Sequence, residues 1–277
     1  MSQHLEQATA SPAVPTRSSA DRLWPVYATS LLVFTAAAAP VVYFNRSMRS
    51  TMPMPGGWTM SMTWMPMGNW IQSTAMFALM WLAMMVAMML PSTLPILLLY
   101  RRVLRFRDAA RAGRMSWLLA CAYFVVWLGF GLAAYGFGIA IAQLAIHSPA
   151  VSSSVPMVAG LALVAAGLYQ LTPLKAACLR HCRDPLLLVS QHTIGGWKGA
   201  VSLGVHHGAF CVACCWALML IQLVIGVMNL AAMVAVALVI ALEKLVPHGV
   251  VVARVVGVIT ATAGVVLAVR AAVALAR

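Results

Sequence analysis

The stretch "GVHHGAFCVACCWALML" (204–220) is apolar enough to cross a membrane, yet it holds two histidines and three cysteines. It opens an apolar region that continues to about residue 275 and is interrupted at Asn229 and at 243–248. One membrane-spanning helix needs about 20 consecutive apolar residues. The region is therefore long enough for more than one span, and the cysteines and histidines are expected inside the first of them.

The composition of the whole chain points to the same class of protein. Of its 277 residues, 63% are hydrophobic and 8% are charged. A soluble domain carries about 25% charged residues, so we predict an integral membrane protein. Eighteen Lys and Arg stand against five Asp and Glu. This excess is typical of positive loops that face the cytoplasm and attract anionic lipid, so we expect membrane lipid and no nucleic acid as a partner.

Apolar runs predict a single transmembrane domain over 23–277, an all-α, polytopic transmembrane helical bundle of six to seven spans. The polar residues 1–22 predict a disordered tail. The expected spans are 24–44, 71–100, 115–146, 155–171, 204–226, 229–246 and 249–273. For 204–246, one long helix followed by a re-entrant piece would also fit.

Lys and Arg in the loops predict the orientation of the bundle. The loop at 101–114 holds six arginines and the loop at 174–203 holds four Lys and Arg, so both are expected in the cytoplasm. The loop at 147–154 has none. Alternation then places the tail inside and the 45–70 loop and the C-terminus outside, in a multi-pass protein of the inner (plasma) membrane.

The cysteines and histidines of the opening stretch have the spacing of one helix face. His207, Cys211 and Cys214 or Cys215 lie at i, i+4 and i+7 or i+8, which is a single stripe. Thiolate and imidazole together suit Cu(I) or Zn(II). Ionisable residues inside spans tend to be functional, so we predict metal ligands here, with His206 included. Packing of cysteine as a small hydrophobic residue is the alternative.

A second group of soft ligands precedes the first in the chain. Cys178, His181 and Cys182 lie at i, i+3 and i+4, again one face if the segment is helical. The predicted topology puts this segment on the cytoplasmic side, at the same end as the first group. The two groups are therefore expected to converge on one metal site.

Methionines gather in the first third of the chain, where twelve of the nineteen lie between Met52 and Met89. The thioether is a soft, neutral ligand that favours Cu(I). Met60 and Met62, in the external loop, are candidate ligands at the outer side. The candidates inside the span are Met84, Met85, Met88 and Met89. Together they suggest a series of thioethers that leads from the external side toward the thiols. The alternative is that these methionines only fill gaps where helices pack.

Few charged or polar side chains accompany these ligands inside the spans. Glu243 is one of five acids, and we predict that it orients a ligating histidine without binding metal itself. Gln170 is predicted to support the site through an interhelical hydrogen bond. Lys244 is interpreted as reaching out to the membrane interface.

Four blocks of the sequence resemble the DUF2182 family of predicted metal-binding integral membrane proteins, sometimes labelled copper chaperones. The blocks are "WLAMMVAMMLPSTLP" (81–95), "YQLTPLKAACLRHCRDP" (169–185), "GVHHGAFCVACCWALML" (204–220) and "LEKLVPHG" (242–249). The resemblance covers about 70–273. It implies a polytopic helical fold and metal binding, and it does not bring a settled activity.

Three functions fit these observations. The first is a Cu(I)-handling membrane protein for uptake or for delivery to a partner copper protein, with copper preferred over zinc because of the methionines. The second is a membrane subunit of a metal-dependent or redox enzyme that acts with a partner. The third is a structural membrane component. No Ser-His-Asp or paired-carboxylate arrangement is visible in the sequence. Whether the chain is an enzyme stays open, and a role without catalysis is favoured.

Overall fold

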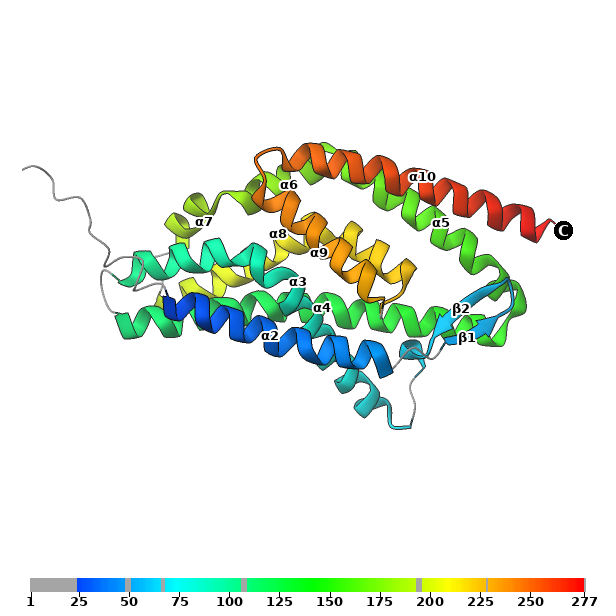
Figure 1. Cartoon of the computed structure of the whole chain (residues 1–277), viewed down its shortest axis with the longest axis horizontal. Coiled ribbons are helices and arrows are strands. Elements are labelled where there is room, and N and C mark those ends of the chain that lie inside the picture. Colours follow the sequence, from blue (N-terminus) through cyan, green and yellow to red (C-terminus); the bar gives the residue numbers. More distant parts are fainter. Residues whose placement is uncertain are drawn as a thin grey trace, which may run out of the picture.

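In the computed structural model the chain is an all-α bundle (Figure 1). The structure describes residues 24–47, 51–65, 68–105, 109–192, 196–227 and 229–276, so the predicted tail lies outside the described residues. The helices are α2 (Trp24–Ser47), α3 (Trp70–Arg105), α4 (Ala109–His147), α5 (Pro149–Leu171), α6 (Pro173–Arg183), α7 (Pro185–His192), α8 (Gly196–Ile225), α9 (Leu230–Leu245) and α10 (Gly249–Leu275). The fold class predicted from the apolar runs is confirmed.

Five of the described helices are long and apolar enough to cross a membrane. They are α3, α4, α5, α8 and α10, with candidate spans at Trp70–Arg105, Arg111–His147, Pro149–Leu171, Gly196–Ile225 and Gly249–Leu275. Two further helices, α2 and α9, occupy the places of the other predicted spans. The apolar part of α2, Tyr27–Tyr43, is shorter. Helix α9 has 16 residues, or about 24 Å at ~1.5 Å per residue, which is less than the ~30 Å hydrocarbon core.

Two segments predicted as loops are largely helical, which corrects the predicted boundaries. Residues 101–105 complete α3, and the described residues from Ala109 to Arg114 begin α4. Arg and Leu are good helix formers, so a helix continues where the apolar run ends. The segment 174–203 contains α6, α7 and the start of α8. Helix α6 begins because the Thr172 hydroxyl accepts a hydrogen bond from the Lys175 backbone N–H and Pro173 follows at the first helical position.

The predicted 45–70 loop contains a small hairpin of β1 (Thr51–Met54) and β2 (Trp58–Ser61), followed by the short helix η1 (Met62–Trp64). The strands are antiparallel with Met52 opposite Met60, and Gly56 and Gly57 turn the chain with positive φ. The Ser152 hydroxyl donates to the Pro55 carbonyl at 2.8 Å, which fixes the hairpin to α5.

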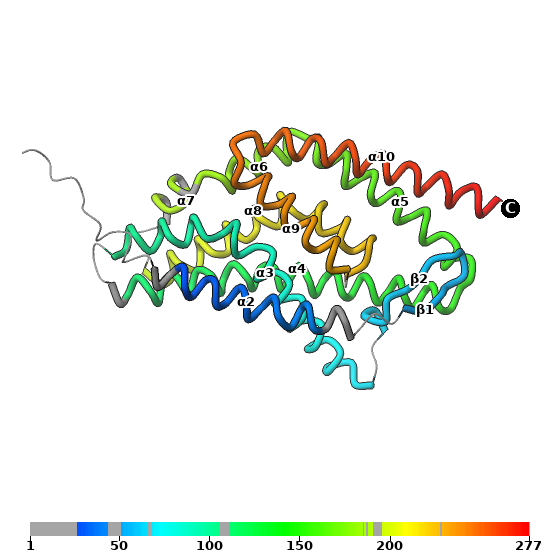
Figure 2. Tube along the Cα trace, in the orientation of Figure 1, coloured from blue at the N-terminus to red at the C-terminus, as the bar shows by residue number. Residues whose placement is uncertain are grey.

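The elements fall at two ends of the bundle (Figure 1, Figure 2). The last turn of α3, the first turns of α4 and the short helix α7 lie at one end. The β1–β2 hairpin, the turn between α4 and α5, and the C-terminus lie at the other. Helices α5 and α10 run together along one edge, and α8 and α9 lie between this pair and α4. The two basic segments therefore share one end, and the methionine-containing hairpin lies at the opposite end.

Glycines let two pairs of helices approach closely. A Cβ at Gly264 of α10 would lie 2.6 Å from the backbone nitrogen of Val164 and 2.7 Å from the carbonyl oxygen of Gly160, both in α5. Small residues that bring backbones together are the usual interface of helices in membranes. At the α4–α8 contact, a Cβ at Gly204 would overlap the carbonyl oxygen of Leu119. Side chains larger than hydrogen are excluded at both contacts.

We predict that Gly264→Ala lowers the free energy of unfolding by about 1–3 kcal/mol, because the new methyl group would press on backbone atoms that cannot rotate away. Denaturant titration of the detergent-purified protein would measure the loss. The matched control is Gly129→Ala in α4, where no heavy atom of the described residues lies within 4 Å of the added Cβ. Equal stability of the two variants would contradict close packing of α5 and α10.

Candidate metal centre

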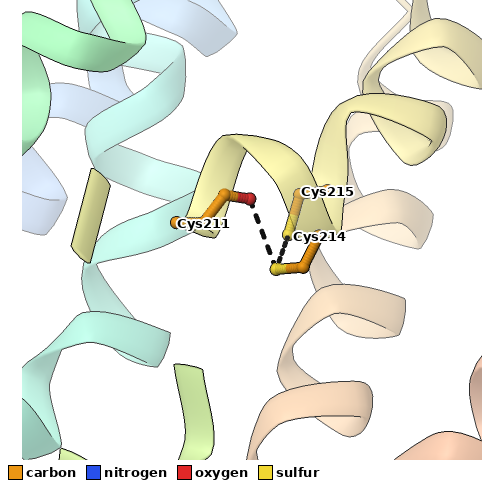
Figure 3. A group of neighbouring side chains, drawn as sticks. All are labelled: Cys211, Cys214 and Cys215. Carbon is orange, nitrogen blue, oxygen red and sulfur yellow. Dashed lines mark hydrogen bonds between the residues drawn. The ribbon is translucent and has the colours of Figure 1, made fainter. Parts of the chain in front are cut away.

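Three cysteines of α8 come together in the interior of the bundle (Figure 3). The sulfur atoms of Cys211, Cys214 and Cys215 all lie within 4.8 Å of one another, and each residue is 0% exposed. The Sγ atoms of Cys214 and Cys215 are 3.3 Å apart, and the Cys214 thiol donates to the Cys211 carbonyl at 3.3 Å. Because α8 is continuous, the predicted helical stripe forms, and its sulfur atoms lie close enough to bind one metal ion.

Helix α6 brings the second predicted group against the first. The Sγ of Cys182 lies 3.8 Å from the Sγ of Cys214, and Cys178 packs against the same core. His181 and His206 meet with 3.0 Å between their Nε2 atoms. The structure therefore places both groups together, as the spacing predicts, while their role as metal ligands stays a prediction.

His207 differs from the neighbouring His206 in that it is buried, with 3% of its surface exposed. Its ring stacks on Tyr123 with 5.3 Å between the centroids. Neither ring nitrogen has a hydrogen-bond partner among the described residues. Buried polar groups normally have a hydrogen-bond partner. These nitrogens are therefore available to bind a group that the described residues do not supply. A metal ion beside Cys211, one helical turn away, would be such a group.

Two polar side chains contact the sulfur of Cys211 directly. The Lys244 ammonium of α9 donates to it at 2.9 Å, and the Tyr123 hydroxyl of α4 lies 2.9 Å away. The interpretation that Lys244 reaches out to the interface is therefore wrong, because its side chain points into the bundle and is 8% exposed. An ammonium group can only donate, so it complements negative charge on the sulfur that it contacts.

A buried ion pair links the cysteines to α6 and α9. The Lys175 ammonium lies 2.7 Å from a carboxylate oxygen of Glu243, and both side chains are 1% exposed. Lys175 also donates to the Cys214 carbonyl, and the Gln170 amide donates to Glu243 at 3.3 Å. Burial acts to lower the pKa of Lys175, but the adjacent Cys215 and Glu243 outweigh it and the pKa lies above its ordinary value.

This arrangement partly matches what the sequence predicts for the two supporting residues. Glu243 and Gln170 do lie beside the cysteines and bond to each other. However, Glu243 accepts hydrogen bonds from Lys175 and Gln170, and neither of these partners is a histidine. The carboxylate therefore balances a buried cation, whereas the sequence suggested that it would orient an imidazole.

The methionines of α3 lie in a different part of the bundle from Met60 of the hairpin and Met62 of η1. Met84, Met85, Met88 and Met89 are buried in the same core cluster as the three cysteines of α8. Met60 belongs to a separate cluster with Ala142 and Ala145 of α4, and Met62 is half-buried at the start of η1. The structure does not bring these two to the thiols.

Aromatic rings occupy the space where a continuous series of thioethers was expected. Trp64 packs against both clusters, and its ring lies 6.2 Å from Phe77 and 6.4 Å from Tyr135. Phe77 in turn lies 5.7 Å from Trp81, one turn before Met84 and Met85. The predicted path of methionines is therefore interrupted by a stack of rings at the hairpin end.

These features define a helical bundle of membrane-length helices with a buried thiol and imidazole centre. The family described as "PpoB2: Copper chaperone" matches residues 78–267. This range is more than half of the 277 residues, and the chain belongs to that family. The range includes every cysteine and histidine discussed above and excludes the hairpin. No curated protein and no solved structure matches the chain.

We predict that Glu243→Gln lowers the free energy of unfolding by about 3–5 kcal/mol, because it leaves Lys175 as a buried cation without its counter-ion. Adding Lys175→Met in the same chain should restore much of the loss, since no uncompensated charge then remains in the pair. Denaturant titration in detergent would measure both.

The matched control for that experiment is Asp184→Asn, the same change at an exposed carboxylate. It is expected to cost far less than Glu243→Gln. If Glu243→Gln and the control lowered the free energy of unfolding by the same small amount, the ion pair would not be holding α6 and α9 together.

Proposed function

We propose that this chain is a multi-pass membrane copper chaperone that binds Cu(I) at Cys211, Cys214 and Cys215 and delivers it to a partner copper protein. The observation that carries the proposal is the group of three buried thiols within 4.8 Å of one another, in a chain that belongs to a copper-chaperone family. Copper is here the cargo of the protein. Uptake of copper across the membrane remains the alternative use of the same site.

The chemistry of the donors favours a soft metal ion. Thiolate and thioether groups select Cu(I), whereas Mg²⁺, Ca²⁺ and Mn²⁺ prefer carboxylate and carbonyl oxygens. The buried carboxylate of Glu243 is engaged by Lys175. Zinc is the alternative, because three thiols and His207 would make a four-coordinate set. The buried methionines of α3 and the family support copper.

The buried charges also suit a metal–thiolate complex. Lys175 and Lys244 contribute two positive charges, which donate hydrogen bonds to the Cys214 carbonyl and the Cys211 sulfur. Glu243, paired with Lys175, contributes one negative charge. A net positive charge buried away from water is costly. A Cu(I) ion held by two thiolates carries a net negative charge, and this complex would neutralise the group.

The position in the membrane follows from the distribution of positive charge. We propose that the end with the segments 101–114 and 174–203 faces the cytoplasm, with the hairpin of Met60 and Met62 outside, in the inner (plasma) membrane. The buried cysteines would then receive copper from the cytoplasmic side, where thiols stay reduced. Membership of the DUF2182 group is the finer family assignment that goes with this proposal.

We predict that serine at Cys211, Cys214 and Cys215 together removes the copper that these three thiols bind. The test is copper content by mass spectrometry, with X-ray absorption to identify the ligand atoms, after anaerobic purification and loading with Cu(I). Cys121→Ser is the matched control, since Cys121 is an exposed thiol of α4 and is expected to change nothing.

Three results would overturn the proposal. Full sulfur-coordinated stoichiometry in the triple variant, or wild-type protein that takes up no Cu(I), would overturn the role of the three thiols. Wild-type protein that prefers Zn(II) when both metals are offered would overturn copper as the cargo. Circular dichroism and size-exclusion chromatography of each variant would establish that the bundle is intact.

We also predict that Met85→Leu with Met89→Leu weakens Cu(I) binding by about tenfold, or ~1.4 kcal/mol, if thioethers complete the site. Leucine has a similar volume, so the free energy of unfolding should change by less than about 1.5 kcal/mol. Competition with a chromogenic Cu(I) chelator would measure the affinity. The control is Met233→Leu, in the same core cluster but on α9, and equal affinities would assign the α3 methionines to packing.

A further inference from the structure

Two histidines face each other at the outer edge of the thiol group. His181 at the last turn of α6 and His206 of α8 have their Nε2 atoms 3.0 Å apart, and both residues are half-buried. The three cysteines of α8 are 0% exposed. The imidazole pair is thus closer to the protein surface than the thiols are. A metal ion that enters from that surface would meet the imidazole pair first.

Each of these histidines is followed in the chain by a ligand that points deeper. Cys182 follows His181 and lies 3.8 Å from Cys214 by its sulfur. His207 follows His206 and is buried. Successive residues of a helix point about 100° apart, so the second side chain of each pair turns away from the imidazole contact. Cys182, itself half-buried, turns toward Cys214, and His207 turns into the interior. The same two helices therefore present an outer and an inner set of ligands.

The geometry of the imidazole pair is close to that of a metal site. A metal bonded to two nitrogens at ~2.0–2.1 Å sets them ~3.4 Å apart in a tetrahedral site and ~4 Å apart in a linear one. The two rings are hydrogen-bonded to each other at 3.0 Å. A metal ion would replace that hydrogen bond and move the two nitrogens apart by ~0.4–1 Å. Phe210 lies against both rings, with centroids 4.0 Å from His181 and 4.9 Å from His206, and it limits how far either ring can turn.

We infer that His181 and His206 form a second metal site, separate from the buried thiols, that accepts Cu(I) first and passes it inward through Cys182. This inference rests on the proposed function only in taking copper as the cargo. Imidazole binds copper well, but thiolate is the softer ligand. The affinity therefore rises from the outer site to the inner one, and Cys182 is placed between them.

The transfer is a ligand exchange in which copper stays Cu(I). Bonds from copper to the two Nε2 atoms break, and bonds from copper to the sulfur of Cys182 and then of Cys214 form. Each thiol that becomes a thiolate ligand releases one proton. A vacated imidazole nitrogen can accept that proton, so neither an oxidant nor a reductant takes part.

The test uses full-length protein in which Cys178, Cys182, Cys211, Cys214 and Cys215 are serine, loaded with Cu(I) as its acetonitrile complex. We expect it to keep one copper per chain, with nitrogen and no sulfur ligands by X-ray absorption. Adding His181→Gln and His206→Gln should remove that copper. The matched control adds His147→Gln and His248→Gln, two exposed histidines, and should keep it.

A rate measurement tests the order of the two sites. In the chain with all cysteines present, His181→Gln with His206→Gln should slow the appearance of thiolate–copper absorption in the ultraviolet while leaving its final amplitude unchanged. Cys182→Ser should slow it as well. Histidine variants of normal rate would overturn the role of the pair as first acceptor, even if the buried site binds copper as proposed.

The outcomes of the equilibrium test are equally decisive. A five-serine chain that is folded but holds no copper, or holds copper on sulfur, would overturn the separate imidazole site. Failure of the proposed function has a different signature, namely wild-type protein without sulfur-coordinated copper. If the glutamine variants did not fold, the single changes His181→Asn and His206→Asn would be used, and each alone should lower the retained copper.

Discussion

Polar side chains inside a bundle of membrane-length helices must be satisfied by the chain itself, because no water reaches them in the apolar region. Around the cysteines this requirement ties three helices to one another. Lys175 of α6 bonds to Glu243 of α9 and to the carbonyl of Cys214 in α8. Lys244, the next residue of α9, bonds to the sulfur of Cys211. The position of the thiols therefore depends on a buried network as much as on apolar packing.

Close helix contacts complete this arrangement. Gly204 and Gly208 lie on the face of α8 that meets α4, where an added Cβ would meet Leu119 and Val126. Their lack of a side chain brings α4 near enough for Tyr123 to reach Cys211. Tyr169 of α5 similarly donates to the carbonyl of Ala213 at 2.6 Å. Backbone and side-chain contacts from two helices thus meet at one turn of α8.

The sequence predicts the helices well because apolar length is a local property. It also predicts the convergence of the Cys and His groups, because both have helix-face spacing and both were placed at the same end by the charge of the loops. The ends of the helices were misplaced, since arginine continues a helix beyond the apolar run. The hairpin was missed because four-residue strands leave too short a pattern of alternation to detect.

Contacts between helices could not be predicted in the same way. Tyr123 stands in an apolar run with no neighbouring ligand in sequence, and its contact with Cys211 spans 88 positions. Lys244 lies near the end of an apolar helix, where a lysine usually extends toward the interface. Which way it turns depends on the rotation of α9 against α8. One signal was present in the sequence. Glu243 is one of only five acids and lies in an apolar helix, and a carboxylate buried there needs a cationic partner.

The two ends of α6 make different contacts. Its first turn is fixed by the Thr172 cap and by Lys175, which is held in the ion pair. Its last turn carries His181 and Cys182, which are only half-buried. A helix of 11 residues transmits the position of its first turn to its last. The ion pair therefore helps to set the distance between Cys182 and Cys214, across which the proposed transfer of copper would take place.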